Sequence, residues 1–241
     1  MIKRTILAAC VAAFGLVALP ALAAAEPVTN NPGDPFLEGV KEGTKFTTVG
    51  GEMKLTASLG TIRCQKYAGS GEFFDPETGS LSIIFEGCTG PLGSVCTSSG
   101  LKSGAIKTTT LPFHLKTIEH EGTMRPGVLI TPGPEEVSHG KHFFTFVCGS
   151  ANKIVVGGNG LVGTITAPNE NEASETATIS FSSTESGSPT QTHRKVTNDN
   201  TEYDLKGSVN GGETQTFALD AEGVITFGEE MKPTLKTTPL E

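Results

Sequence analysis

Residues Ala177–Thr184 read ATISFSST, and this stretch states most clearly what kind of fold the chain forms. Ile179 and Phe181 alternate with threonine and serine, so one face of an extended segment is apolar and the other is polar. This period of two is typical of a strand in an antiparallel sheet that buries one face and turns the other toward water.

Similar short apolar or alternating runs recur along the chain, and no segment after the first 25 residues keeps a 3.6-residue period for more than about two turns. The predicted strands are Leu55–Gly60, Thr61–Cys64, Leu81–Gly87, Leu111–Thr117, His142–Gly149, Lys153–Gly158, Leu161–Ala167, Ala177–Thr184, Thr214–Asp220 and Gly223–Glu229. This number of short strands predicts an all-β fold, an antiparallel β-sandwich or barrel.

Turn-forming residues separate these runs. DPETG at Asp75–Gly79 places Pro at the second turn position and Gly at the end. The Asn-Gly pairs at Asn159–Gly160 and Asn210–Gly211 suit tight hairpins, because both residue types tolerate positive φ. AEG at Ala221–Gly223 predicts another reversal.

The chain opens MIKRTILAACVAAFGLVALPALAAAEP, which has the features of a secretory signal peptide. Lys3 and Arg4 precede the apolar run Ile6–Leu19, and the small residues Ala21–Ala23 suit a signal peptidase. The run is shorter than the roughly 20 apolar residues of a membrane-spanning helix. We therefore expect that the chain is exported and that a signal peptidase cleaves it near Ala23. The mature protein is then expected to be secreted and extracellular.

The remaining chain is expected to form one large β domain over residues 44–231. An extended N-terminal arm over 24–43 precedes the domain, and a tail over 232–241 follows it. The polar segment 167–175 marks a subdivision if there is one, but the part that follows it offers few strands.

The net charge is −8, and removal of Lys3 and Arg4 makes the exported chain still more acidic. The longest basic cluster is only His193–Lys195, which argues against binding of nucleic acid or of anionic membranes. No later apolar stretch is long enough for a spanning helix, so we expect no membrane insertion of the mature chain. The sequence has no Trp and only two Tyr residues, which disfavours an aromatic sugar-binding platform.

Four cysteines remain after Cys10 is removed with the signal: Cys64, Cys88, Cys96 and Cys148. An even number in an exported chain predicts two structural disulfides. Three pairings are possible, and the sequence leaves the connectivity open. Cys88–Cys96 would be a local bridge, because TGPLGSV can fold back to close it, and Cys64–Cys148 would then be the second bridge. The spacing does not match the C-x(2–4)-C pairs of zinc knuckles, and the redox motif CxxC is missing.

Catalytic motifs are missing as well, since the sequence contains neither GxSxG nor HExxH. His120, His139 and His142 could form a zinc site only if the fold brought their loops together. We therefore assign no catalytic residue.

The segment NDNTEYD offers the best cofactor candidate. It places oxygen ligands at Asn198, Asn200, Glu202 and Asp204, and hard cations such as calcium take ligands of this kind. The Gly and the distal Glu of an EF-hand are missing, so this prediction is a weak calcium site, and the main expectation is no cofactor.

The segments GTIRC and LSIIFEGCTGPLGSVCTSSGLKSGAIKTTTL, followed by FTFVCG and LVGTITAP, resemble a group of uncharacterised secreted four-cysteine proteins of actinobacteria. The resemblance implies export and a β-fold held by cysteines. It transfers no catalytic or binding residue.

The sequence thus favours a secreted, non-enzymatic protein of the extracellular space or the cell envelope, with a binding or structural role and an unknown extracellular or cell-surface ligand. One alternative is a secreted hydrolase whose site is assembled from loops around His120 or His142. The other is a calcium-dependent adhesion module.

Overall fold

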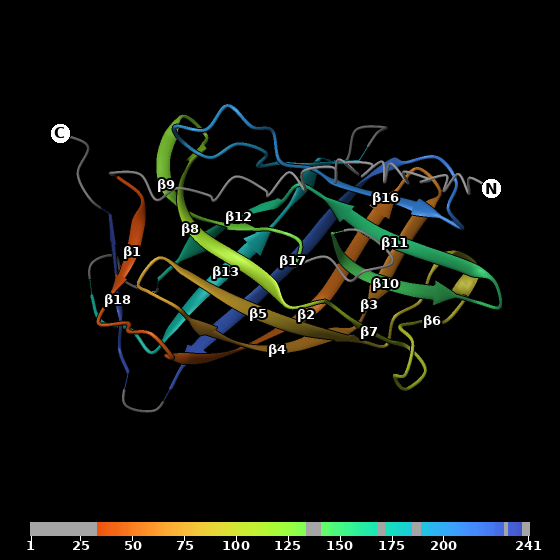
Figure 1. The fold of residues 1–241 in the computed structure, drawn as a ribbon, viewed down its shortest axis with the longest axis horizontal. Helices are drawn as coiled ribbons and strands as arrows, with labels where there is room; N and C mark the ends of the chain where they lie inside the picture. Colours follow the sequence, from red (N-terminus) through yellow and green to blue (C-terminus); the bar gives the residue numbers. More distant parts are fainter. Residues whose placement is uncertain (1–32, 134–140, 168–171, 185–188, 229–230, 238–241) are drawn as a thin grey trace, which may run out of the picture.

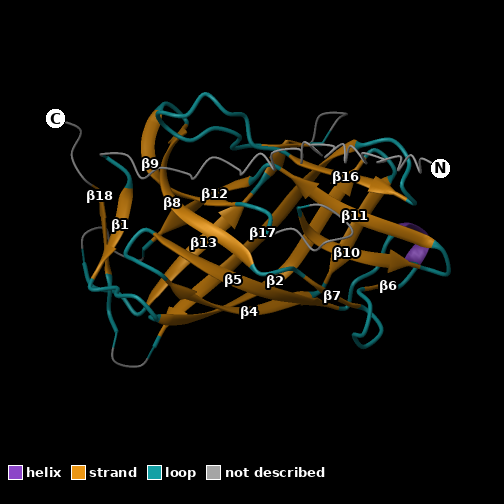
Figure 2. Cartoon of the chain, in the orientation of Figure 1, coloured by secondary structure: helices purple, strands orange, loops and turns teal. Residues whose placement is uncertain are grey.

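The computed structural model describes residues 33–133, 141–167, 172–184, 189–228 and 231–237, and this part of the chain is almost entirely β-structure (Figures 1 and 2). The expected signal peptide and His139 lie outside these ranges. The strands are β1 Pro35–Glu38, β2 Lys45–Ala57, β3 Gly60–Cys64, β4 Lys66–Phe73, β5 Thr78–Glu86, β6 Cys96–Thr97, β7 Ala105–Lys107, β8 Leu111–His120, β9 Thr123–Ile130, β10 His142–Cys148, β11 Asn152–Gly158, β12 Leu161–Thr166, β13 Thr176–Phe181, β14 Ser183–Thr184, β15 Thr190–Gln191, β16 Leu205–Val209, β17 Gln215–Phe227 and β18 Thr234–Thr237, and a single 3-10 turn covers Pro91–Gly93.

Antiparallel pairing closes part of the main sheet on itself. The order β2-β4-β5-β8-β9-β12-β13-β17 returns to β2, because β17 pairs with β2 along almost its whole length. The apolar faces of these strands pack against one another across the interior, so the walls form a sandwich-like arrangement. The all-β, antiparallel fold class is therefore confirmed.

The two 13-residue strands β2 and β17 extend beyond this ring and join it to a second section. There β2 pairs with β3, and β17 continues into the order β16-β11-β10-β6. In Figure 1 the short β1–β18 pair lies at one end of the elongated molecule and β6 at the other. β12 and β13, on either side of segment 167–175, pair with each other within the ring.

Two disulfides stabilise the second section, as the cysteine content predicts, and their connectivity differs from the local Cys88–Cys96 pairing. Cys64 pairs with Cys88, and Cys96 pairs with Cys148. Cys96 and Cys148 are directly opposite each other on β6 and β10, with Cα atoms 4.0 Å apart. Strand register therefore decides the connectivity, and it overrides the short separation in sequence that favours Cys88–Cys96.

Two predicted turns are also wrong. β17 passes straight through Ala221–Gly223 with a bulge opposite β2, and Gly223 leaves room for the ring of Tyr67. At Asn159–Gly160 the strands on either side, β11 and β12, do not pair with each other. In contrast, the Asp75–Gly79 turn joins β4 to β5, and Asn210–Gly211 has positive φ at both residues between β16 and β17.

The core is one contiguous apolar cluster that reaches through both sections. Aromatic rings lie over strand glycines in it: Phe46 covers Gly71, and Tyr67 covers Gly50 and Gly223. The space left inside the ring is about 50 Å³, far below the 300–1,000 Å³ of a small-molecule pocket. The interior of the ring is therefore packed core.

The start of the described chain is anchored by a buried ion pair. The Asp34 carboxylate lies 2.6 Å from Lys116 Nζ on β8, and both side chains are at most 3% exposed. Asp34 also accepts a hydrogen bond from the Thr117 amide (3.2 Å), and the Thr117 hydroxyl donates to the Gly33 carbonyl (2.7 Å). These contacts bind residues 33 and 34, within the expected arm, to the outer face of β8.

Candidate functional site

The four residues of the calcium candidate belong to a loop in which an arginine binds the carboxylates. Arg194 Nε lies 2.7 Å from Asp204 Oδ1, and Arg194 Nη2 lies 2.9 Å from Asp204 Oδ2 and 2.8 Å from Glu202 Oε2. Asn198 and Asn200 are exposed, and Asn198 has a positive φ of 62°. Within the described ranges no group of three or more His, Cys, Asp or Glu side chains is placed to hold a metal ion. The loop thus gives a calcium site no support.

The same loop belongs to a segment, residues 192–204, that covers the outer face of β8, β9 and β12. Val196 and Tyr203 pack on Ile118, Leu129 and Val162, which form a second apolar cluster outside the ring. The Thr197 amide donates to the Thr117 carbonyl of β8 (2.8 Å). This packing places His193, at the start of the segment, next to His120 at the end of β8.

His120 and His193 form a histidine pair. Nδ1 of His120 lies 3.2 Å from Nε2 of His193, and the ring centroids are 4.9 Å apart. The residues are 73 positions apart in the chain. Sequence reasoning gives no role to His193, and nothing near it in the sequence could have revealed this contact. His142, the other described histidine of the zinc hypothesis, is buried on β10.

Hydrogen bonding determines which ring nitrogens of the pair carry protons. The His193 ring also donates to the Glu119 carbonyl, and this donor must be Nδ1, because Nε2 faces His120. In neutral His193, Nε2 therefore has no proton and accepts the hydrogen bond of His120 Nδ1–H. When both rings are neutral, the last nitrogen, His120 Nε2, has a free lone pair.

Burial favours the neutral form of the acceptor ring. Desolvation lowers the pKa of His193 below its usual value, and a charge on His120 lowers this pKa further, although the Glu119 carbonyl opposes both. The structure therefore favours a neutral His193.

The histidine pair borders a groove of about 260 Å³ on the outside of the ring. Thr164 and Thr166 of β12, Ser180 of β13 and Ser182 just after β13 line it with hydroxyl groups, and Arg125 of β9 adds a cation. As far as the structure describes the chain, the lining contains no Asp or Glu. The groove thus combines hydroxyls, imidazoles and a guanidinium, which suits binding of a polar group that accepts hydrogen bonds.

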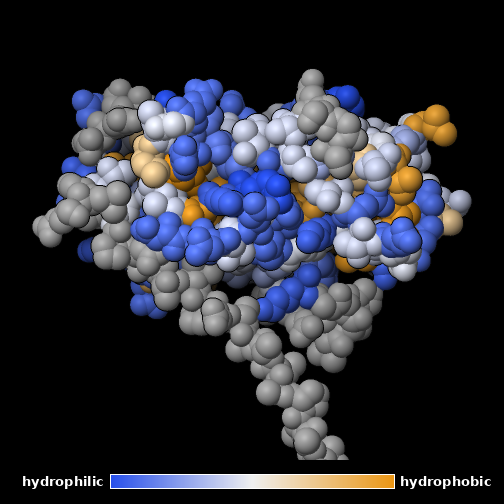
Figure 3. Space-filling view, turned by 90° about the horizontal axis from the view of Figure 1, so that it is seen from above, coloured by the Kyte–Doolittle hydropathy of each residue, from blue (hydrophilic) through white to orange (hydrophobic). Residues whose placement is uncertain are grey.

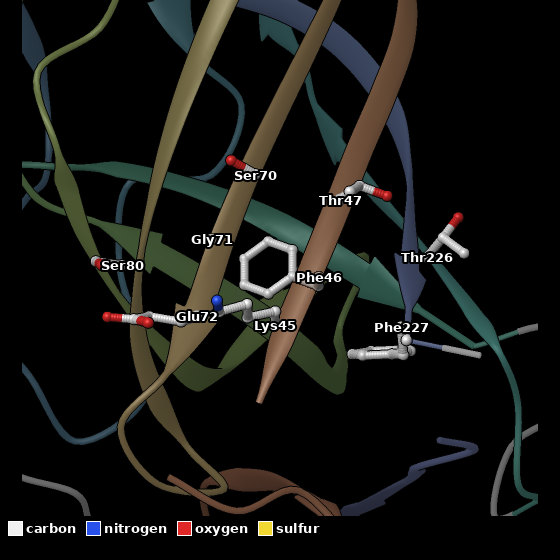
Figure 4. A pocket seen from close by; sticks show the side chains of 10 residues that line it. Lys45, Phe46, Thr47, Ser70, Gly71, Glu72, Ser80, Thr226 and Phe227 are labelled. Atoms are coloured by element: carbon white, nitrogen blue, oxygen red, sulfur yellow. The ribbon is translucent and has the colours of Figure 1, made fainter. Parts of the chain in front are cut away.

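A larger hollow of about 640 Å³ lies on the outer face of β2, β4, β5 and β17 (Figure 4). Lys45 and Glu72 are direct cross-strand partners there, and the other polar side chains include Thr47 and Ser70. The residues that line this hollow include no histidine. The surface seen in Figure 3 is mainly hydrophilic, with small separate hydrophobic patches.

Elsewhere on β8, His114 makes the stability of the fold sensitive to acid. Its Nδ1 is buried without a hydrogen-bond partner among the described residues. Burial, and then the charge of Lys116, lower the pKa of His114. The folded state thus binds fewer protons than the unfolded state, whose histidines titrate near pH 6.5, so stability is lost as pH falls from about 7 toward 5.

We therefore expect a His114→Gln variant to lose less of its melting temperature between pH 7.5 and pH 5.5 than the wild type. Differential scanning calorimetry in weakly binding buffers measures this difference. Equal decreases in the melting temperature of the two proteins would show that His114 does not contribute to the acid sensitivity of the fold.

Within the described ranges, the chain forms no helix with the length and apolar character that a membrane crossing requires. The chain matches no protein-family model, no curated protein and no solved structure.

Proposed function

We propose that this protein is exported and works outside the cell as a disulfide-stabilised, non-enzymatic binding protein, with the His120–His193 groove as its ligand site. The groove carries the proposal, because it gathers polar side chains from β8, β9, β12 and β13 and from the covering segment on one sheet. The signal-like N-terminus supports export, and so do the two disulfides, because disulfides persist in oxidising compartments. The resemblance to secreted actinobacterial proteins agrees with export and with a fold held by cysteines.

The composition of the groove favours binding over hydrolysis. A glycosidase needs two carboxylates at a set separation, and the described lining of the groove has none. A cysteine nucleophile needs a free thiol, whereas Cys64, Cys88, Cys96 and Cys148 are all in disulfides. The carboxylates of Glu202 and Asp204 bind Arg194, which leaves the calcium-dependent adhesion module with less support.

The test is a ligand screen with matched variants. Secreted protein is titrated by NMR with small anionic, neutral and cationic compounds, and hydrolase substrates are assayed in parallel. We expect at least one compound class to bind with no turnover, and the variant Arg125→Gln/Ser182→Ala to weaken this binding at least tenfold.

The control is Arg63→Gln, which removes the same charge from an exposed arginine of β3, outside the groove. It should leave the affinity unchanged. Hydrolysis of any substrate, or binding that the groove variant does not weaken, would contradict the proposal.

A further inference from the structure

The groove offers an excess of hydrogen-bond donors. The Arg125 guanidinium is exposed, and among the described residues its Nε contacts only the Thr123 hydroxyl (3.3 Å). Ser180 already donates to Glu222 (2.9 Å), but the hydroxyls of Thr166 and Ser182 have no hydrogen bond to another described residue. Donors around a guanidinium, without a carboxylate in the lining, match a group that has several acceptor oxygens and a negative charge.

His120 determines when such a group can bind well. With both rings neutral, the free lone pair of Nε2 would repel an anion. A proton on Nε2 converts the ring into a cation and a donor, and Nδ1–H can keep its hydrogen bond to neutral His193. The neighbouring ring thus allows His120 to become charged without loss of its partner.

From these contacts we infer that the groove binds an oxyanion group, such as a sulfate, phosphate or carboxylate, and that His120 takes up one proton when the anion binds. The inference rests on the proposed function, and it specifies the ligand class and the pH dependence of the same site. The charged and titratable groups around His120 are Glu119 and Glu121 on its own hairpin, Arg125 on β9, His193 on the covering segment and, across the groove, Glu222 bound to Ser180.

Proton uptake has a measurable consequence. Because coupling between two binding events is reciprocal, an anion that binds the protonated form should bind about tenfold tighter per pH unit of acidification while His120 is neutral in the free protein. The increase should occur wherever His120 is neutral in the free protein, and it should level off once the free protein already carries the proton.

The experiment measures the affinity of the full exported chain for inorganic sulfate, which does not titrate in this range, at pH 8.0, 7.0 and 6.0. Isothermal titration in two buffers of different ionisation enthalpy counts the protons taken up. We expect uptake approaching one proton at pH 8.0 and a resonance shift of His120. Acetate in place of sulfate distinguishes a carboxylate site from a site for tetrahedral anions.

Three variants assign the effect. His120→Gln should abolish the pH dependence of the affinity and retain weak binding. Arg125→Gln should weaken binding at every pH and leave the pH dependence of the affinity unchanged. His114→Gln is the matched control, because this histidine lies on the same face of β8 but outside the groove, and its slope should equal that of the wild type.

The outcomes also separate this inference from the proposed function. Sulfate and acetate that fail to bind, or that bind without a pH slope, would overturn the inference, while another compound in the groove would still support a binding protein. A slope that survives in His120→Gln would overturn the assignment to this residue. If no compound of any class perturbs the groove, the proposed function fails as well.

Discussion

Asp34→Asn is expected to lower the free energy of unfolding by about 3–5 kcal/mol, which is the usual cost when one partner of a buried ion pair is removed. The carboxylate lies 2.6 Å from Lys116 Nζ, and the side chains are 3% and 2% exposed. In the variant the buried Lys116 ammonium loses the carboxylate that lies 2.6 Å from it. Urea denaturation followed by circular dichroism measures the effect.

A second substitution distinguishes the charge effect from lost packing. Asp34→Asn/Lys116→Met removes both charges, keeps an oxygen at position 34 that can accept from the Thr117 amide, and should regain most of the lost stability. Glu175→Gln is the control, because Glu175 and its ion-pair partner Lys232 are 57% and 60% exposed, and solvent screens such a pair so that its loss should change stability little. If Asp34→Asn costs no more than this control, the ion pair does not stabilise the fold.

The second large effect is expected from removal of the Cys96–Cys148 disulfide. The bridge closes a loop with a sequence separation of 52, and the chain-entropy relation gives about 4 kcal/mol for a loop of this size. Cys96→Ala/Cys148→Ala should therefore unfold at much lower urea concentration than the wild type. The Cys64–Cys88 bridge, with a separation of 24, should contribute slightly less, about 3.5 kcal/mol.

Counting of free thiols in the same variants tests the connectivity. Cys96→Ala/Cys148→Ala should show none after alkylation under denaturing conditions, because Cys64–Cys88 stays intact. Cys64→Ala/Cys148→Ala removes one cysteine from each bridge and should show two. The opposite pattern would establish Cys88–Cys96 pairing and contradict the structure.

Much of the strand content could be predicted because it depends on local pattern. The alternation in Ala177–Thr184 predicts β13, and the apolar run at His142–Gly149 predicts β10. Errors arise where a glycine serves packing instead of a turn. Gly223 makes room for Tyr67 within β17, and Gly160 makes room for Tyr203 after β11. The sequence alone does not show that these tyrosine rings pack against these glycines.

The candidate site was harder to predict, because its parts are distant in sequence. His120 follows the predicted strand Leu111–Thr117 by three residues, and its partner His193 lies 73 residues further on. The calcium prediction rests on an acidic loop in which Arg194, only eight residues before Glu202, binds the carboxylates of Glu202 and Asp204.

The sequence by itself determined the fold class and the presence of two disulfides. It did so because strand periodicity, turn residues and the number of cysteines are local or compositional properties. The tertiary structure alone decided the cysteine pairing, the closure of β17 on β2, the buried contact of Asp34 with Lys116, and the groove beside His120 and His193. Each of these depends on strand register and on segments that pack across the sheet, and that information exists only once the chain has folded.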